Sequence, residues 1–185
     1  MTLWAVVPKS TPAAALLADG HYSRRTVGST QFMPPGQTLV LLTHDELAVF
    51  GWWRPHPSSG IVAMNHLDGW TCTIFRNTGP LRSSDLILAA ERELIARYAC
   101  GPDGLLTYVW DAKVRSRNPG YCFKVAGWHR LGRSADGRKT LLHKDAALAG
   151  IPLPLAGPNS PLRVSDGERR PGAFGRDTAG VRTGA

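Results

Sequence analysis

The chain has 185 residues, a hydrophobic fraction of 43% and a formal net charge of +8. This composition supports one packed domain and argues against a fully disordered chain. The apolar runs are too short to cross a membrane, and the N-terminus lacks the basic region and long apolar stretch of a secretory signal. Three cysteines without a CxxC spacing disfavour a disulfide framework and a cysteine-only zinc site, so we expect a basic, cytoplasmic protein.

The apolar pattern predicts a chain that alternates between strands and helices. In chain order we expect a strand, a helix, three strands, a helix, a strand, a helix and a hairpin, over residues 3–7, 10–25, 37–43, 47–54, 69–75, 83–99, 105–110, 118–127, 128–131 and 139–143. This order favours α and β elements around one central sheet.

The helix over residues 83–99 has the clearest signals. It carries an apolar stripe at helical spacing, Ser83 or Ser84 with Asp85 as an N-terminal cap, and Gly101-Pro102 as a stop. The texture changes after residue 148, where proline, glycine and arginine replace large apolar residues. We therefore predict a catalytic domain over residues 1–148 and an extended tail over residues 149–185.

Positive charge concentrates in one stretch of the sequence. Residues 113–139 contain eight basic residues and one acid, Asp136, and so carry nearly all of the net charge. Such clusters are typical of contact with a phosphate backbone, although a solvated basic face would have the same composition. The candidate phosphate-binding residues are Arg24, Arg25, Arg115, Arg117, Arg130 and Arg133.

Two junctions place polar residues at strand ends. Residues 75–84 join a strand to the long helix and contain two arginines and a glycine, which makes this helix start a candidate anion site unless it is an ordinary turn. Asp111 directly follows the strand over residues 105–110. A carboxylate there serves as a general base or orients an amine, unless it only caps the next turn.

His21 and Tyr22 lie near the end of the first predicted helix. Histidine can be a base, an acid or a metal ligand, but a lone histidine is more often structural, and no HxH or HxxxH spacing supports a metal site. Tyr121 and Cys122 lie on the short helix after Asp111, where we expect Cys122 to be packing. Most of the six tryptophans are expected in the core, with one or two able to stack on a base.

These motifs together resemble the GNAT acyltransferase fold. Arg76-Asn77-Thr78-Gly79 matches the first half of that family's donor loop, (R/Q)xxGx(G/A), while Leu81 stands at the second small position. The resemblance implies an α/β (α+β) single domain with a central mixed, mostly antiparallel sheet flanked by helices. The donor-binding residues it implies are Arg76, Asn77, Gly79, Arg82, Ser83, Ser84 and Asn118.

More specifically, residues 10–145 resemble the Mom family of phage DNA-modification proteins. Four short motifs occur in the same order, namely HYSR at 21–24, FRN at 75–77, RSSD at 82–85 and NPGYCFKVAGW at 118–128. The resemblance implies an enzyme that places a carbamoylmethyl group on the exocyclic amine of adenine in DNA, which protects that DNA from host restriction. The catalytic residues it implies are His21, Tyr22, Asp111 and Tyr121, with Arg76 or Arg82.

The donor of such a group stays open at this point. The GNAT resemblance implies acetyl-CoA, and a role for iron is also open. Because glycyl-adenine and carbamoylmethyl-adenine are isomers, an activated glycine such as glycyl-tRNA would supply the same atoms. We expect DNA as the main partner, with the target base extruded from the duplex, and tRNA as a second partner if glycine is the donor.

Two other functions fit the same sequence. One is an ordinary GNAT N-acetyltransferase acting on a protein or a small amine, which a complete donor loop would favour. The other is a non-enzymatic DNA-binding antirestriction protein. That function explains the charge but not a carboxylate at a strand end together with a His-Tyr pair.

Overall fold

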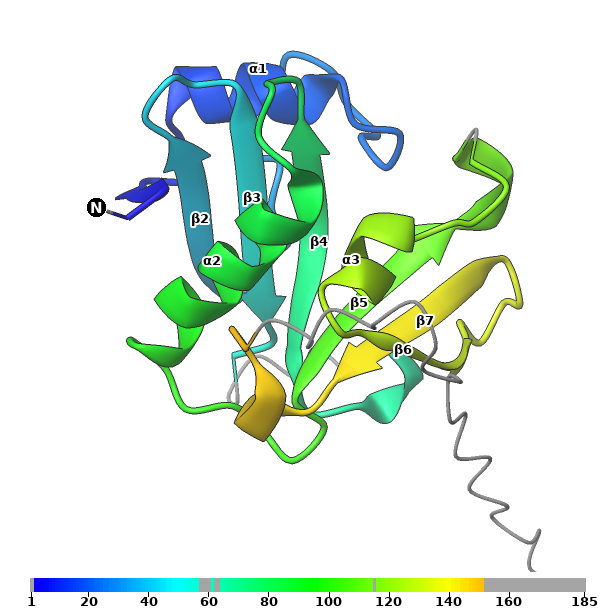
Figure 1. Ribbon diagram of the computed structural model, residues 1–185. Helices are drawn as coiled ribbons and strands as arrows, with labels where there is room; N and C mark the ends of the chain where they lie inside the picture. The colour runs from blue at the N-terminus through cyan, green and yellow to red at the C-terminus, as the bar shows by residue number, and fades with distance from the viewer. Residues whose placement is uncertain (1, 57–60, 62–63, 115, 152–185) are drawn as a thin grey trace, which may run out of the picture. The chain divides into compact units, whose positions relative to one another are not determined.

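The computed structural model describes residues 2–56, 61, 64–114 and 116–151 (Figure 1). Within them, seven strands form one sheet in the order β1-β2-β3-β4-β5-β7-β6, and only β4 and β5 pair in parallel. The predicted α+β domain with a mixed, mostly antiparallel sheet is therefore confirmed. The elements are β1 (Trp4–Val7), α1 (Pro12–Asp19), β2 (Gln37–Thr43), β3 (Ala48–Arg54), β4 (Trp70–Asn77), α2 (Ser83–Ile95), β5 (Leu105–Trp110), α3 (Tyr121–Val125), β6 (His129–Arg133) and β7 (Lys139–Lys144).

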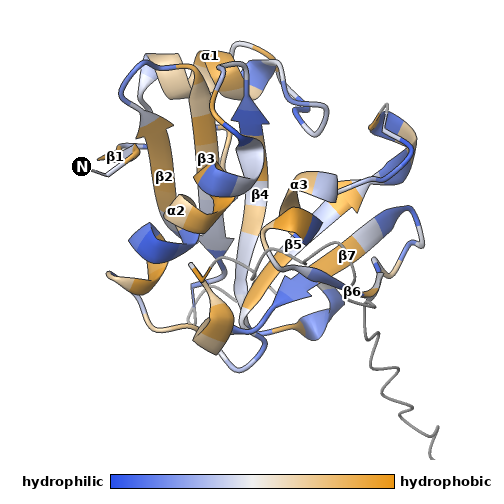
Figure 2. Ribbon diagram, in the orientation of Figure 1, coloured by the Kyte–Doolittle hydropathy of each residue, from blue (hydrophilic) through white to orange (hydrophobic). Residues whose placement is uncertain are grey.

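Helices cover both faces of the sheet. Consecutive residues of a strand point to opposite faces, so a strand that is apolar at every position needs a helix on each side. β2 and β3 have this character and appear largely hydrophobic in Figure 2. Val40 and Val49 pack with α1, whereas Leu41 and Phe50 belong to the larger core formed with α2 and α3.

Two buried indole groups attach α2 to the sheet. Trp4 Nε1 donates to the carbonyl oxygen of Leu86 at 3.0 Å, and Trp52 Nε1 donates to that of Ala90 at 3.1 Å. Leu86 and Ala90 are four residues apart, so both bonds hold the same side of the helix. This attachment fixes the rotation of α2, and with it the connection between β4 and β5.

A buried ion pair joins α2 to β7 and to the end of α3. Lys144 Nζ lies 2.7 Å from Glu91 Oε2 and also donates to the carbonyl oxygen of Ala126 at 2.8 Å. Glu91 accepts two more bonds, from Trp128 Nε1 at 2.6 Å and from the Gly150 amide at 2.5 Å. Both charges are almost fully buried, so their hydrogen bonds replace the lost hydration.

α1 is shorter than the sequence predicted. It ends at Asp19 with Gly20 as its C-cap, not at residue 25. The Asp19 carboxylate accepts hydrogen bonds from Arg24 Nε and from the Gly28 amide, and these bonds turn the chain back on itself. As a result, the residues that follow α1 form a folded loop, and His21 and Tyr22 lie on that loop and not on a helix.

The other two helices also differ from prediction at their ends. α2 stops at Ile95 instead of residue 99, and its N-cap is Arg82 without a side-chain capping bond, so the predicted serine cap is wrong. α3 is confined to five residues because Gly120 precedes it in the left-handed conformation, with φ of 73°. A β-carbon at Gly120 would also lie 2.5 Å from Leu142 Cδ1.

The described chain stays attached to the domain beyond residue 148. The carbonyl oxygen of Gly150 accepts a hydrogen bond from Arg92 at 3.0 Å. From residue 152 onward, the predicted tail over 149–185 lies outside the described residues. Within the described ranges, no helix is long and apolar enough to cross a membrane.

Candidate active site

A cleft opens where β4 and β5 separate. Their parallel pairing stops at Cys72 and Thr107, although β4 continues to Asn77 and β5 to Trp110. Beyond that point β4 remains paired with β3, and β5 with β7, so the two halves of the sheet diverge (Figure 1). Ligands of open sheets typically bind at the carboxyl ends of parallel strands, which is where this cleft lies.

The cleft has two connected lobes that share Tyr22, Cys72, Thr73 and Tyr108. The small lobe has a volume of about 170 Å³ and is mostly apolar. Its further lining includes His21, Phe75, Val109, Gly120, Cys122 and Phe123. The wide lobe has a volume of about 640 Å³, and its further lining includes Arg25, Trp53, Trp110, Lys113 and Lys139.

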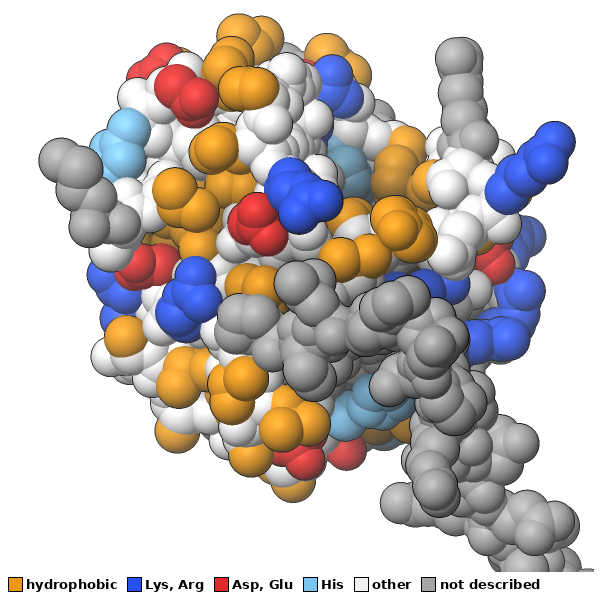
Figure 3. Space-filling model, viewed as in Figure 1, with side chains coloured by type: hydrophobic (Ala, Val, Ile, Leu, Met, Phe, Trp, Pro, Cys, Tyr) orange, Lys and Arg blue, Asp and Glu red, His pale blue; other side chains and the backbone are white. Residues whose placement is uncertain are grey.

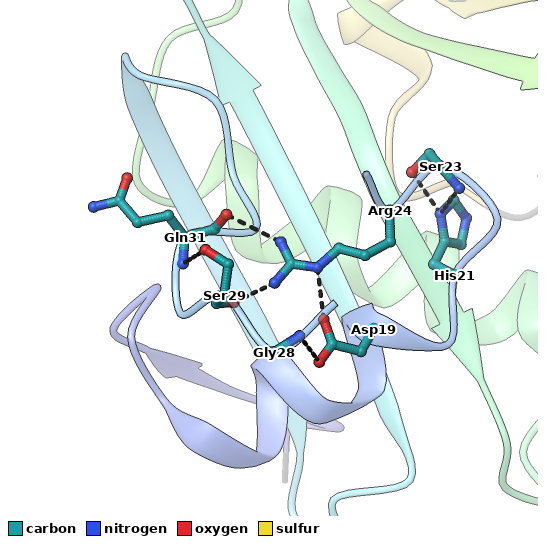
Figure 4. Close-up of polar contacts among 7 residues, drawn as sticks. All are labelled: Asp19, His21, Ser23, Arg24, Gly28, Ser29 and Gln31. Atoms are coloured by element: carbon teal, nitrogen blue, oxygen red, sulfur yellow. Dashed lines mark hydrogen bonds and ion pairs between the residues drawn. The ribbon is translucent and has the colours of Figure 1, made fainter. Parts of the chain in front are cut away.

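His21 contributes a neutral imidazole to the small lobe. Burial, together with the nearby Arg76 guanidinium, lowers its pKa from 6.5 to about 4. Its Nδ1 accepts a hydrogen bond from the Ser23 amide at 3.3 Å and lies 2.7 Å from Ser23 Oγ (Figure 4). Because Nδ1 accepts, the proton of the neutral ring is on Nε2, which makes Nε2–H the donor left for a ligand.

Tyr22 separates the two lobes and is also uncharged at neutral pH. Burial raises the pKa of its phenol to about 12, against a backbone hydrogen bond from Trp110 that lowers it. The Asp111 carboxylate adds to the upward shift. The His21 and Tyr22 rings lie 4.2 Å apart between centroids at an interplanar angle of 32°, so they form one tilted pair beside both lobes.

Burial also raises the pKa of the Cys72 and Cys122 thiols. A thiol held in its protonated form is a weak nucleophile, since the thiolate is the reactive species. We therefore assign both cysteines to the wall of the cleft, in agreement with the packing role expected for Cys122.

Asp111 lies just beyond β5, where the sequence predicted a carboxylate at a strand end. Its Oδ2 accepts a hydrogen bond from Thr140 Oγ1 at 3.0 Å and lies 3.3 Å from the Arg133 guanidinium. Its Oδ1 is buried and has no hydrogen-bond partner among the described residues. An unpaired carboxylate oxygen is costly to bury, and Asp111 does not belong to the lining of either lobe.

A scan against protein-family models and searches of curated proteins and of solved structures found no match to this chain. Its chemistry is therefore inferred from its own side chains. Among the described residues, no group of three or more His, Cys, Asp and Glu side chains is placed to hold a metal ion. Iron thus has no ligand set in this part of the chain.

The predicted donor loop is largely occupied by contacts within the protein. Asn77 Nδ2 donates to the carbonyl oxygen of Leu81 and to Ser83 Oγ, and Asn77 Oδ1 accepts from the Gly79 amide. The Thr78 amide is also bound, to the carbonyl oxygen of the hairpin residue Leu47. The groups left for an anionic donor at this loop are the Arg82 side chain and the start of α2 at Ser83 and Ser84.

Arg76 makes a contact within the protein that the sequence did not predict. Its guanidinium donates to the carbonyl oxygen of Gly20 at the end of α1 and lies near His21. A β-carbon at Gly20 would overlap Arg76 Cζ, so a larger residue there would push the guanidinium aside. Arg76 therefore holds the His21 loop and adds to the lowering of the imidazole pKa by burial.

Two predicted residues on the third-helix motif face away from the cleft. Tyr121 is 60% exposed and lines neither lobe, whereas its neighbours Cys122 and Phe123 line the small lobe. Asn118 Oδ1 accepts a hydrogen bond from Lys124 at 2.5 Å and so stabilises α3 itself.

The predicted phosphate-binding arginines divide into paired and unpaired groups. Arg24 is committed to the loop, where it bonds Asp19 and the carbonyl oxygens of Ser29 and Gln31 (Figure 4). Arg133 pairs with Asp111. The exposed side chains of Arg25, Arg117 and Arg130 form no ion pair with a described carboxylate, and Arg115 lies outside the described residues.

The wide lobe contains residues that the sequence analysis did not select as a site, chiefly Trp53, Tyr108, Trp110, Lys113 and Lys139. The sequence of β5 could have indicated part of this lobe. Tyr108 and Trp110 alternate with buried neighbours, which predicts aromatic side chains on one face of the strand. Lys and Arg side chains also gather beside this region in Figure 3, on the side of the molecule where β5 and the β6–β7 hairpin end.

Proposed function

We propose that this protein is a DNA-modification enzyme with a GNAT-like fold, which adds a carbamoylmethyl-type group to the exocyclic amine of adenine and so protects phage DNA from host restriction. The observation that carries the proposal is that His21 and Tyr22 line the cleft at the ends of the parallel strands, while Asp111, about 90 residues later and directly after β5, lies near enough to Tyr22 to raise the pKa of its phenol. The order of the Mom-like motifs supports the same function.

The side chains suit attack by a weak nucleophile on an acyl carbon. The adenine amine nitrogen bonds to the acyl carbon, the carbonyl electron pair moves onto oxygen, and Asp111 Oδ1 takes the amine proton. His21 Nε2–H and the Tyr22 hydroxyl are neutral donors that stabilise the oxyanion. Collapse of the intermediate releases the donor's leaving group, which takes a proton. With a pKa near 4, His21 is thus an electrophilic group, and Asp111 is the base.

The donor that fits best is an activated glycine, for which glycyl-tRNA is the natural form. A coenzyme A pyrophosphate would need the amides of residues 78 and 79, which already donate within the protein. Glycyl transfer would give glycyl-adenine. The glycyl amine then attacks the ring carbon and displaces the amide nitrogen, which stays as the carboxamide of the isomeric carbamoylmethyl product. Acetyl-CoA remains the alternative that the GNAT resemblance implies.

Mass spectrometry of nucleosides from cells that express the protein tests this function. We expect modified adenine with the wild type, a 10²- to 10⁴-fold lower yield with Asp111→Asn, and a wild-type yield with Asp136→Asn in the exposed β6–β7 turn. Labelled glycine should appear in the modified base. Labelled acetate there would assign the donor to acetyl-CoA. Unmodified DNA from cells with soluble wild-type protein would refute the proposal and favour a non-enzymatic DNA-binding protein or an acetyltransferase for other amines.

A further inference from the structure

The two lobes of the cleft differ so much in volume that they must accept ligands of different size. Sites for whole small molecules usually measure about 300–1,000 Å³. The wide lobe, at about 640 Å³, falls in this range, whereas the small lobe, at about 170 Å³, admits only a small group such as a short acyl chain. The wide lobe is therefore the part of the cleft that can hold a planar base together with its sugar.

Aromatic side chains form much of the wall of the wide lobe. Trp110 and Tyr108 come from the end of β5 that pairs with β7 but no longer with β4, and Trp53 comes from the end of β3. The Trp110 ring is further ordered by two ammonium groups, those of Lys113 at 5.6 Å and Lys139 at 5.9 Å from its centroid. Aromatic rings of this kind bind nucleobases by stacking, with little dependence on base identity.

The charges around the wide lobe are all positive. Its lining contains Arg24, Arg25, Lys113 and Lys139 and no Asp or Glu. Arg24 is neutralised by Asp19, but Arg25, Lys113 and Lys139 form no ion pair with a described carboxylate. Three unpaired cations around an aromatic cavity match the charge and shape of a nucleotide, whose phosphate is at one end and whose base is flat.

We propose that the wide lobe binds one nucleotide extruded from a DNA strand, with its base on Trp110 and its phosphates against Arg25, Lys113 and Lys139. This inference rests on the proposed function and places its acceptor. Tyr22, Cys72 and Thr73 belong to both lobes, so a base in the wide lobe presents its edge to the small lobe. The exposed Arg117 and Arg138 lie on the segments that carry Lys113 and Lys139, where neighbouring phosphates of the same strand would run.

The test uses two single-stranded DNA oligomers of seven nucleotides with a fluorophore at one end. One oligomer is abasic throughout, and the other is abasic except for a central adenine. Wild-type protein should bind the adenine strand about 5- to 150-fold more tightly, as expected for one stacked base. Trp110→Ala should bind both strands alike, and Trp110→Phe should keep most of the preference. Thermal melting verifies that each variant is folded. Equal binding of the two strands by the wild type, or an undiminished preference in Trp110→Ala, would overturn the inference.

The lysines are tested by salt dependence. Lys113→Gln with Lys139→Gln should weaken both strands equally and lower the slope of log affinity against log salt by about 0.7 for each lost phosphate contact. Arg97→Gln, after α2 and outside the lobe, removes the same charge from an exposed side chain and should leave both the affinity and the salt slope unchanged. An unchanged slope in the double variant would show that these lysines do not contact phosphates.

Competitors distinguish the sources of the nucleotide. Coenzyme A or tRNA that displaces the adenine strand only in proteins with Trp110 would assign the lobe to the donor and overturn the inference. Its failure is separable from that of the proposed function. Adenine modification at a wild-type rate by Trp110→Ala would refute nucleotide binding in the wide lobe but support the proposed function. A Trp110-dependent preference for the adenine strand, without any modified adenine in cells, would support nucleotide binding in the lobe but refute the proposed function.

Discussion

Lys144→Met should be strongly destabilising because it leaves the Glu91 carboxylate buried without its cation. The Lys144 side chain is 2% exposed and that of Glu91 is 0% exposed, so water cannot replace the lost ammonium group. Glu91 keeps its bonds from Trp128 and Gly150, but the carbonyl oxygen of Ala126 loses its donor. The same change loosens the junction between α2 and the end of α3, which carries one wall of the small lobe.

Removing one partner of a buried pair costs about 3–5 kcal/mol of unfolding free energy. For a domain of this size, each kcal/mol lowers Tm by about 2–4 °C, so Lys144→Met should lower Tm by about 6–20 °C. A single domain has about 5–15 kcal/mol of unfolding free energy in total. The variant would therefore lose a large part of its stability and would populate the unfolded state at growth temperature.

Urea unfolding and thermal melting followed by circular dichroism measure the effect. Lys124→Met is the matched control, since Lys124 lies on the surface of α3 and contacts only a neutral amide, and it should change stability by less than about 1 kcal/mol. Adding Glu91→Gln to Lys144→Met removes the isolated charge and should cost less than the sum of the two single changes. A Tm for Lys144→Met within about 2 °C of wild type would refute the buried pair.

Three further outcomes follow from the site. Gly20→Ala should displace the Arg76 guanidinium and cost about 0.5–1.5 kcal/mol in urea unfolding, with a rise in the His21 pKa seen by NMR. Because folded His21 stays neutral down to about pH 4 while the unfolded chain protonates near 6.5, the unfolding free energy should rise with pH between these values, and His21→Gln should reduce that slope. Arg133→Gln should leave the salt slope of DNA binding unchanged, since this arginine already pairs with Asp111; a fall of about 0.7–0.9 would make it a phosphate contact.

The sequence was sufficient for the strands and less so for the helix ends. All seven strands lie where the sequence predicted them. β2 and β3 are apolar at nearly every position because both faces of the sheet are covered there, whereas β6 is mostly exposed and was predicted from the turn that joins it to β7. α1 stopped early for a reason that composition does not reveal. The Asp19 carboxylate accepts hydrogen bonds from Arg24 and from the Gly28 amide, which lie five and nine residues later, and these bonds close the loop. Local propensity favours a continued helix there, and tertiary contacts override it.

The same division applies to the site. Asp111 was predictable because the end of a buried strand is a defined place in a sheet, and the structure puts it there. The wide lobe was not predictable, because it exists only where β4 and β5 stop pairing, and no local pattern marks the last pair, Cys72 with Thr107. The orientation of Tyr121 is a matter of one residue on a five-residue helix. A shift of one position turns a side chain by about 100°, which exchanges Tyr121 for Cys122 at the cleft.

Net charge alone therefore does not distinguish the cations that are free for a ligand from those that pair within the protein. Arg133 belongs to the basic stretch over residues 113–139, yet it serves the Asp111 carboxylate, and Arg24 serves the loop that carries His21. Arg25, Lys113 and Lys139 come from three separate segments and form no ion pair with a described carboxylate where the wide lobe opens. Arg133 and Thr140 bind only Oδ2 of Asp111 and leave Oδ1 without a partner among the described residues, so under the proposed function Oδ1 is the acceptor for a neutral amine and the three unpaired cations are the contacts for phosphates.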